Sequence, residues 1–185
     1  LHGYLQPTDV SGYNLVTDRG EQKVVGGAAY LAAHLKRLRA GRKNSIFFSA
    51  GDNFSGWPFT VDSHANEPTV EVLNALGLQF STVGNHELDQ RFPEFLIEHM
   101  EKGKPYGVAG RDSSFADSTG QRFGGANFSF YTSNVVFNDS GLTIVPPYNI
   151  VQVDAGNGTT LPVAFIHLTV TDTARATNGS SGILR

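Results

Sequence analysis

Three short polar segments contain the residue types that bind divalent metal ions. They read Leu1-His2-Gly3, Gly51-Asp52-Asn53 and Gly84-Asn85-His86-Glu87-Leu88-Asp89. Asp52 suits a bridging position between two cations because a carboxylate has two oxygens and a negative charge. Asn85 offers a carbonyl oxygen and His2 an imidazole nitrogen. We therefore predict His2, Asp52 and Asn85 as ligands of two divalent cations, which favour such oxygen and imidazole donors.

A pair of such ions is suited to the hydrolysis of phosphate esters. Two metal ions about 3.5–4 Å apart can generate hydroxide at neutral pH and stabilise both the attacking and the leaving oxygen. The departing alkoxide still needs a proton, and His86 suits this role because imidazole titrates near neutrality. In a helical turn, Asp89 lies three residues beyond His86 on the same face and can accept a hydrogen bond from its ring. We predict His86 and Asp89 as the catalytic residues, with Glu87 pointing elsewhere and supporting the turn.

Two apolar runs precede the second and third polar segments. Residues 45–50 lead into Gly51 and residues 80–83 lead into Gly84, as expected of buried strands that deliver polar loops. In an open α/β sheet, ligands bind in the crevice beyond the carboxyl ends of the strands. The two loops are therefore expected to meet at one edge of a sheet.

Helical patterns alternate with these strands. Residues 27–40 and 68–76 carry apolar side chains at helical spacing, and a glycine follows each as a stop signal. Residues 93–100 indicate a third helix. This alternation predicts an α/β fold of layered β-sheets flanked by helices, with parallel neighbouring strands.

The second half of the chain is richer in strand patterns. Candidate strands cover 128–136, 144–153 and 163–169. His167 ends an apolar run and is predicted to be a hydrogen-bonded residue at a strand end rather than a ligand. The remaining histidines, His34, His64 and His99, are predicted at the surface or in packing. Trp57 with Phe54 and Phe59 could line a substrate cleft or merely pack, and the pattern leaves this open.

Composition excludes several classes of partner. With 14 Lys+Arg against 17 Asp+Glu, the formal net charge of -3 gives no general attraction to a nucleic-acid duplex or an anionic membrane. The absence of cysteine excludes disulfides and thiolate ligands. No apolar run approaches the roughly 18 residues of a membrane span. The expected partner is a small-molecule phosphate ester, and the oligomeric state stays open.

The combination of G-D-N with G-N-H-E-L-D and an upstream His2-Gly3 resembles the calcineurin-like metallophosphoesterases, closest to their 5′-nucleotidase branch. Gly26-Gly27-Ala28 before the first helix adds to the match. In that branch the aspartate of G-D bridges two metals and the asparagine of G-N-H-E binds one of them. The following histidine and the aspartate three residues further form a catalytic dyad. The resemblance implies these roles for Asp52, Asn85, His86 and Asp89, and it matches His2 to the histidine of an opening D-x-H motif.

Two parts of the family pattern are absent from this sequence. The aspartate of D-x-H and the opening strand would precede Leu1, and the downstream histidines, including a G-H-x-H/Q motif, would follow the last residues. Residues 1–185 are therefore expected to form a single partial metallophosphoesterase domain. The C-terminal nucleotide-binding domain of the family's nucleotidases has no counterpart here.

The resemblance implies a hydrolase that acts on phosphate esters, nucleotides above all, through two divalent metal ions (Zn, Mn, Fe or Mg) and a His-Asp dyad. This activity is expected of the full-length parent and not of the fragment alone. A secreted, periplasmic or cell-surface location is implied in the same way. The alternative is a catalytically inactive binding or surface protein on the same fold.

Overall fold

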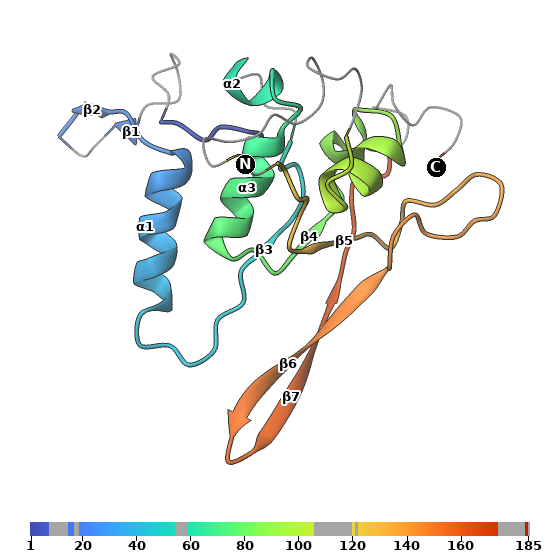
Figure 1. Cartoon of the computed structure of the whole chain (residues 1–185). Coiled ribbons are helices and arrows are strands. Elements are labelled where there is room, and N and C mark those ends of the chain that lie inside the picture. Colours follow the sequence, from blue (N-terminus) through green and yellow to red (C-terminus); the bar gives the residue numbers. More distant parts are fainter. Residues whose placement is uncertain are drawn as a thin grey trace.

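The computed structural model describes residues 1–7, 15–16, 19–54, 59–105, 120, 122–173 and 184. Figure 1 shows helices and short strands gathered in one body, from which a long hairpin projects. The elements in chain order are β1 (Leu15–Val16), β2 (Gln22–Lys23), α1 (Gly27–Arg39), β3 (Phe48–Ser49), α2 (Phe59–Asp62), α3 (Glu67–Leu76), β4 (Phe80–Thr82), the 3-10 turn η1 (His86–Leu88), the π-helix η2 (Glu94–Glu101), β5 (Ser129–Tyr131), β6 (Tyr148–Gly156) and β7 (Thr159–Ile166).

A parallel sheet of order β3-β4-β5 positions the polar loops. Phe80 of β4 pairs with Phe48 on one side and with Ser129 on the other. The predicted parallel arrangement of the strands at 45–50 and 80–83 is confirmed. Because parallel strands point the same way, the segments that follow β3 and β4 leave the sheet at the same edge.

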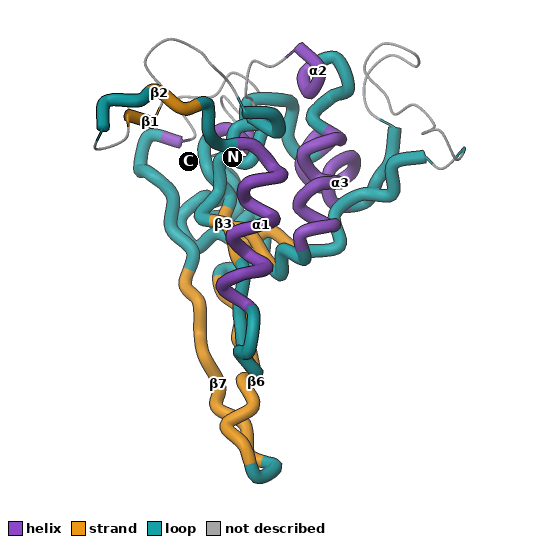
Figure 2. The backbone as a smooth tube through the Cα atoms, turned by 90° about the vertical axis from the view of Figure 1, so that its left-hand side faces the viewer, coloured by secondary structure: helices purple, strands orange, loops and turns teal. Residues whose placement is uncertain are grey.

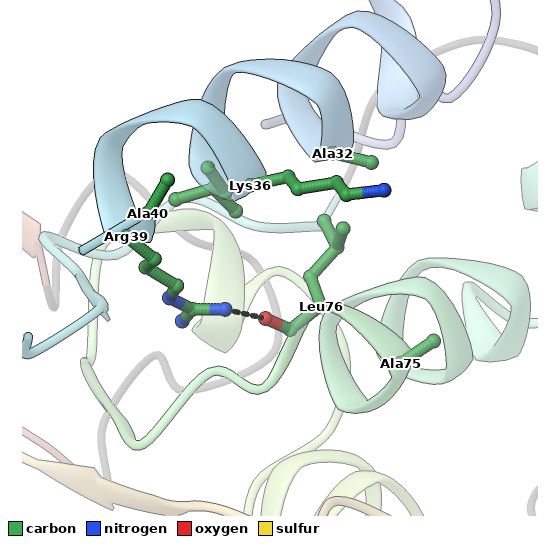
Figure 3. A pocket seen from close by; sticks show the side chains of 7 residues that line it. Ala32, Lys36, Arg39, Ala40, Ala75 and Leu76 are labelled. Carbon is green, nitrogen blue, oxygen red and sulfur yellow. Dashed lines mark hydrogen bonds between the residues drawn. The ribbon is translucent and has the colours of Figure 1, made fainter. Parts of the chain in front are cut away.

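Helices α1 and α3 run side by side along the body (Figure 2). Gly77 ends α3 in the left-handed conformation, at φ 72°, which glycine adopts without the penalty of a Cβ atom. Arg39 reaches across from α1, and its Nη1 donates a 2.9 Å hydrogen bond to the carbonyl of Leu76 at the end of α3 (Figure 3). A cation at this position also interacts favourably with the negative end of the helix dipole.

A cavity of about 570 Å³ lies between the same two helices. It is lined by Ala32, Leu35, Lys36, Arg39, Ala40, Ala75 and Leu76, which include none of the residues predicted for the functional site (Figure 3).

The hydrophobic core lies under the helices and along the parallel sheet. It combines α3, the π-helix and the strands β4 and β5, and its fully buried members include Phe54, Val70, Val83, Leu88, Leu96, Met100 and Phe130. Burying one such side chain contributes about 1.5–3 kcal/mol relative to leaving it exposed. Val83 and Leu88 lie immediately before and within the third polar segment, so the core anchors that segment.

The three strands predicted in the second half are present as β5, β6 and β7, but their bounds differ from the predicted ones, and β6 and β7 form an antiparallel hairpin. Pro146 and Pro147 precede β6, which fits the inability of proline to donate to a ladder. Asn157-Gly158 closes the hairpin with both residues at positive φ, the geometry of a two-residue turn. The strand predicted at 128–136 is confined to Ser129–Tyr131.

Phe165, near the end of β7, packs against aromatic rings of the parallel sheet. The ring centroid of Phe165 lies 4.7 Å from that of Phe80 and 5.3 Å from that of Phe48. Lys43 Nζ approaches Asp154 Oδ2 to 2.7 Å and ties the hairpin to the connection before β3. Within the described part of the chain, none of the helices has both the length and the apolar character that crossing a bilayer requires.

Candidate metal centre

The loops after β3 and β4 touch through two glycines. A Cβ atom on Gly51 would lie 2.6 Å from the backbone nitrogen of Gly84, and one on Gly84 would lie 2.2 Å from Asp52 Oδ1. Real Cβ atoms do not approach so closely, and Gly51 also holds a φ of 97°. These glycines therefore allow the carboxylate of Asp52 to lie directly against the neighbouring loop.

The N-terminal segment completes the edge of this site. The backbone nitrogen of His2 donates to the carbonyl of Asp52 at 3.1 Å, and that of Gly3 donates to the carbonyl of Asn53 at 3.0 Å. The imidazole of His2 consequently reaches the third polar segment, where its ring lies edge-on to that of His86 with centroids 4.9 Å apart.

His2, Asp52 and His86 form a compact group of donors. Each offers one ligand atom, and these atoms lie within 4.8 Å of one another. His2 Nε2 is 3.9 Å from Asp52 Oδ2, while the backbone nitrogen of His86 donates to Asp52 Oδ1 at 3.2 Å. Imidazole and carboxylate donors such as those of His2 and Asp52 fit a divalent transition-metal ion, and the ring of His86 lies beside them.

His86 also pairs with Asp89. Its Nδ1 lies 2.6 Å from Asp89 Oδ2, and about a third of each side chain is exposed. Both residues belong to the 3-10 turn η1 and its C-terminal cap, so the predicted contact across three residues is confirmed. The contact orients the ring of His86.

Glu87 is fully buried under this site, with 1% of its surface exposed. Its Oε2 accepts hydrogen bonds from the backbone nitrogens of Asp52 and Gly84, each at 2.8 Å. Its Oε1 accepts from the backbone nitrogen of Asn53 at 2.8 Å and from Asn53 Nδ2 at 3.0 Å. The predicted support of its own turn thus extends to the loop after β3.

Asn53 connects the same network to the sheet. It is 1% exposed, its Nδ2 also donates to Ser81 Oγ at 2.9 Å, and its Oδ1 accepts from Ser49 Oγ at 2.7 Å. Ser49 and Ser81 are paired residues of β3 and β4. Asn53 is therefore a buried link between two strands and one loop.

The electrostatics of the site follow from burial. Desolvation lowers the pKa of His2, against the carboxylate of Asp52, which raises it. The balance favours the neutral imidazole, the form that ligates metals. Desolvation raises the pKa of Glu87, against the three backbone N–H groups, which lower it.

The remaining predicted residues have varied places. Asn85 is half-buried at the start of η1, and its role as a metal ligand stays a prediction. Phe54 is buried in the core, Phe59 is 82% exposed, and Trp57 lies outside the described residues.

The other histidines follow the predictions where the structure describes their surroundings. His167 is buried at the end of β7, where Nδ1 contacts Thr82 Oγ1 and Nε2 contacts Asn149 Oδ1, both at 2.8 Å. The prediction of a hydrogen-bonded strand-end histidine is therefore confirmed. His99 is fully buried and packs near Phe95 and Phe123, whereas His34 and His64 are exposed.

Known proteins share both the sequence pattern and the fold. The family model of the calcineurin-like phosphoesterases matches residues 1–168. An uncharacterized protein of Acinetobacter calcoaceticus is 36% identical over 127 residues, which cover 68% of this chain and 60% of that protein. Endonuclease YhcR of Bacillus subtilis is 33% identical over 141 residues, 76% of this chain and 10% of that protein. The chain thus spans only part of the length of both relatives.

Two further comparisons concern proteins with nucleotidase names. The 5′-nucleotidase of Bos taurus is 31% identical over 104 residues, which cover 55% of this chain and 17% of that protein. The solved structure of a 5′-nucleotidase precursor from Thermus thermophilus superimposes with a TM-score of 0.67 at 23% identity, covering 98% of this chain and 29% of that one. The latter comparison establishes a shared fold of mixed α/β content.

Proposed function

Because this chain belongs to the calcineurin-like phosphoesterase family, we propose that it supplies part of a metal-dependent site for hydrolysing phosphate esters, nucleotides above all, in a longer protein. The observation that carries the proposal is the convergence of His2, Asp52 and His86, whose donor atoms lie within 4.8 Å of one another. Three segments far apart in the sequence meet there, and each contributes one side chain suited to phosphate chemistry.

Cation binding falls to the side chains at the strand ends. His2 and Asp52 would hold the divalent ions together with Asn85, as the family resemblance implies. Bound divalent ions supply positive charge for the phosphate oxygens and lower the pKa of a water molecule toward neutrality. The chain's net charge of -3 makes such a local source of positive charge necessary for binding an anionic substrate.

Proton transfer falls to His86. Hydrolysis breaks the bond between phosphorus and the ester oxygen, and water provides the new oxygen of the phosphate. The alkoxide that leaves must gain a proton, which His86 can donate from Nε2 while Asp89 holds Nδ1 at 2.6 Å. Asp89 thereby fixes the direction in which the ring faces the substrate.

The nucleotide preference is supported by the names of two relatives, the 5′-nucleotidases of Bos taurus and Thermus thermophilus. Their lengths greatly exceed this chain, so the base-recognition surface is proposed to lie in a separate domain of the longer protein. The same proposal includes a location of the longer protein outside the cytoplasm. It also includes a role in nucleotide catabolism. Fractionation of source cells with an antibody to this chain would test it, and recovery in the cytoplasm alone would overturn it.

The function is tested by assaying the longer protein with Mn²⁺ or Zn²⁺ on a panel of nucleoside monophosphates, cyclic nucleotides and nucleotide sugars. We expect release of inorganic phosphate from a monophosphate. His86→Ala should lower the rate by about 10²–10⁴-fold, the usual contribution of positioned proton transfer. His34→Ala, which changes an exposed histidine of α1, should leave the rate unchanged. Undiminished turnover by His86→Ala would defeat the assignment, and no turnover of any phosphate ester would favour the binding-protein alternative.

A further inference from the structure

We propose that Glu87 is a positioning residue that locks the loop of Asp52 and the loop of His86 into one rigid metal-binding edge. This inference rests on the proposed function, because it assigns Glu87 the task of holding the ligands in place. Glu87 itself faces the backbone and is not proposed to touch a cation or a substrate.

The contacts of Glu87 join segments that the chain keeps far apart. One carboxylate oxygen bridges the backbone nitrogens of Asp52 and Gly84, each at 2.8 Å. These nitrogens are 32 residues apart in sequence and belong to the loops after β3 and β4. The other oxygen binds the backbone and the side chain of Asn53 at 2.8 and 3.0 Å. The side chain of Glu87 thus holds the loop after β3 and the loop after β4, which together carry the candidate metal centre.

The residue type fits this arrangement closely. Four N–H groups converge on two oxygens, so both oxygens must act as acceptors, which a carboxylate provides. Glutamine at this position would direct an NH₂ group against two N–H donors and leave them without an acceptor. Aspartate keeps the charge but is one methylene shorter, and it cannot reach donors on both loops at these distances.

Burial makes the loss of these hydrogen bonds costly. Glu87 is 1% exposed, and Asn53 beside it is equally buried. Water is therefore poorly placed to replace Glu87 as the partner of the N–H groups of Asn53 and Gly84, whose hydrogen bonds to it are buried, and a buried donor left without a partner is costly. Residues that hold metal ligands in orientation typically change metal affinity by about 10–100-fold when they are replaced.

The first measurement uses the wild-type chain and amide hydrogen exchange followed by NMR. The amides of Asp52, Asn53 and Gly84 lie outside helices and strands, yet they should exchange as slowly as the amides of β4. Gly156 offers a matched comparison because its nitrogen is also held by a carboxylate, that of Asp154 at 2.7 Å, but at an exposed site. Exchange of the three amides as fast as that of Gly156 would overturn the proposal without any substitution.

The second measurement compares Glu87→Gln and Glu87→Asp with Glu67→Gln. Glu67 is also buried and lies 3.1 Å from His99 Nε2, in α3 and outside the site. We expect both Glu87 variants to lose at least about tenfold of the protection of the three amides and about 10–100-fold in Mn²⁺ affinity. Glu67→Gln should lower the global stability of the fold, while the protection of the three amides and the Mn²⁺ affinity stay unchanged.

The outcomes separate this inference from the proposed function. If Glu87→Gln retains amide protection and Mn²⁺ affinity equal to those of Glu67→Gln, the positioning role is wrong. If the amides respond as expected but the longer protein hydrolyses no phosphate ester, the locking of the loops holds and the proposed function fails.

Discussion

The ring of His86 is held by Asp89, whose Oδ2 lies 2.6 Å from His86 Nδ1 across the turn η1. The two residues are three positions apart, and both side chains remain about a third exposed. The pair can therefore meet a substrate from solvent while the backbone nitrogen of His86 stays bound to Asp52 Oδ1 at 3.2 Å.

Asp89→Asn should weaken catalysis more than binding. The substitution keeps the shape of the side chain but removes the negative charge that lies against His86 Nδ1 and orients its ring. We expect kcat of the longer protein to fall by about 10–10²-fold, less than the roughly 10²–10⁴-fold that positioned proton transfer itself contributes, with KM little changed. Steady-state kinetics on a nucleoside monophosphate provide the check, and a loss confined to KM would contradict the role of the pair.

Asp52→Asn should reduce metal affinity without unfolding the chain. The carboxamide oxygen can still accept the hydrogen bond from the backbone nitrogen of His86, whereas the negative charge that would attract a cation is lost. Titration calorimetry should give Mn²⁺ affinity at least about tenfold lower, equal to about 1.4 kcal/mol. Asp154→Asn, which changes an exposed carboxylate of the hairpin, should have no such effect. Equal affinities for the two variants would count against Asp52 as a ligand.

Gly84→Ala should destabilise the fold and distort the site together. The added Cβ would lie 2.2 Å from Asp52 Oδ1 and 2.6 Å from its backbone nitrogen, so one loop must move. Overpacking of this kind typically costs about 1–3 kcal/mol. At Gly124 a Cβ would meet no described atom within 4 Å, so Gly124→Ala is the matched control. Urea unfolding should separate the two variants by at least about 1 kcal/mol, and equal midpoints and slopes would refute the close approach.

His167 should make the fold less stable in mild acid. Burial lowers its pKa, so below about pH 6.5 the unfolded chain gains a proton before the folded chain does. The free energy of unfolding should therefore decline as the pH falls from about 6.5 toward the folded pKa. His167→Gln retains groups that can contact Thr82 and Asn149 but does not titrate. Denaturant unfolding at neutral and mildly acidic pH should show a smaller decline for this variant, and an unchanged decline would contradict the assignment.

The strands and helices around the site could be predicted because local pattern and tertiary packing agree there. The run before Gly51 and the run before Gly84 became the paired strands β3 and β4, since each is apolar and ends in residues that favour loops. His86 and Asp89, three residues apart, are in contact as predicted because the chain forms a tight turn at that point.

The hairpin and the buried network could be predicted less well. The dipeptide Asn157-Gly158 favours a two-residue hairpin turn and so indicates the register of β6 and β7. The apolar runs alone do not contain this information. For Glu87, sequence spacing indicates only its own turn. Its contacts with Asp52 and Asn53 depend on how two strands pair, a relationship that no local pattern contains.

Selective paramagnetic broadening of the histidine ring signals, when Mn²⁺ is added to the chain, tests the candidate metal centre most directly. We expect the rings of His2 and His86 to broaden together at the lowest concentrations, while those of His34 and His64 remain sharp. Broadening of exposed histidines alone, or of all rings equally, would contradict a metal centre at the ends of β3 and β4.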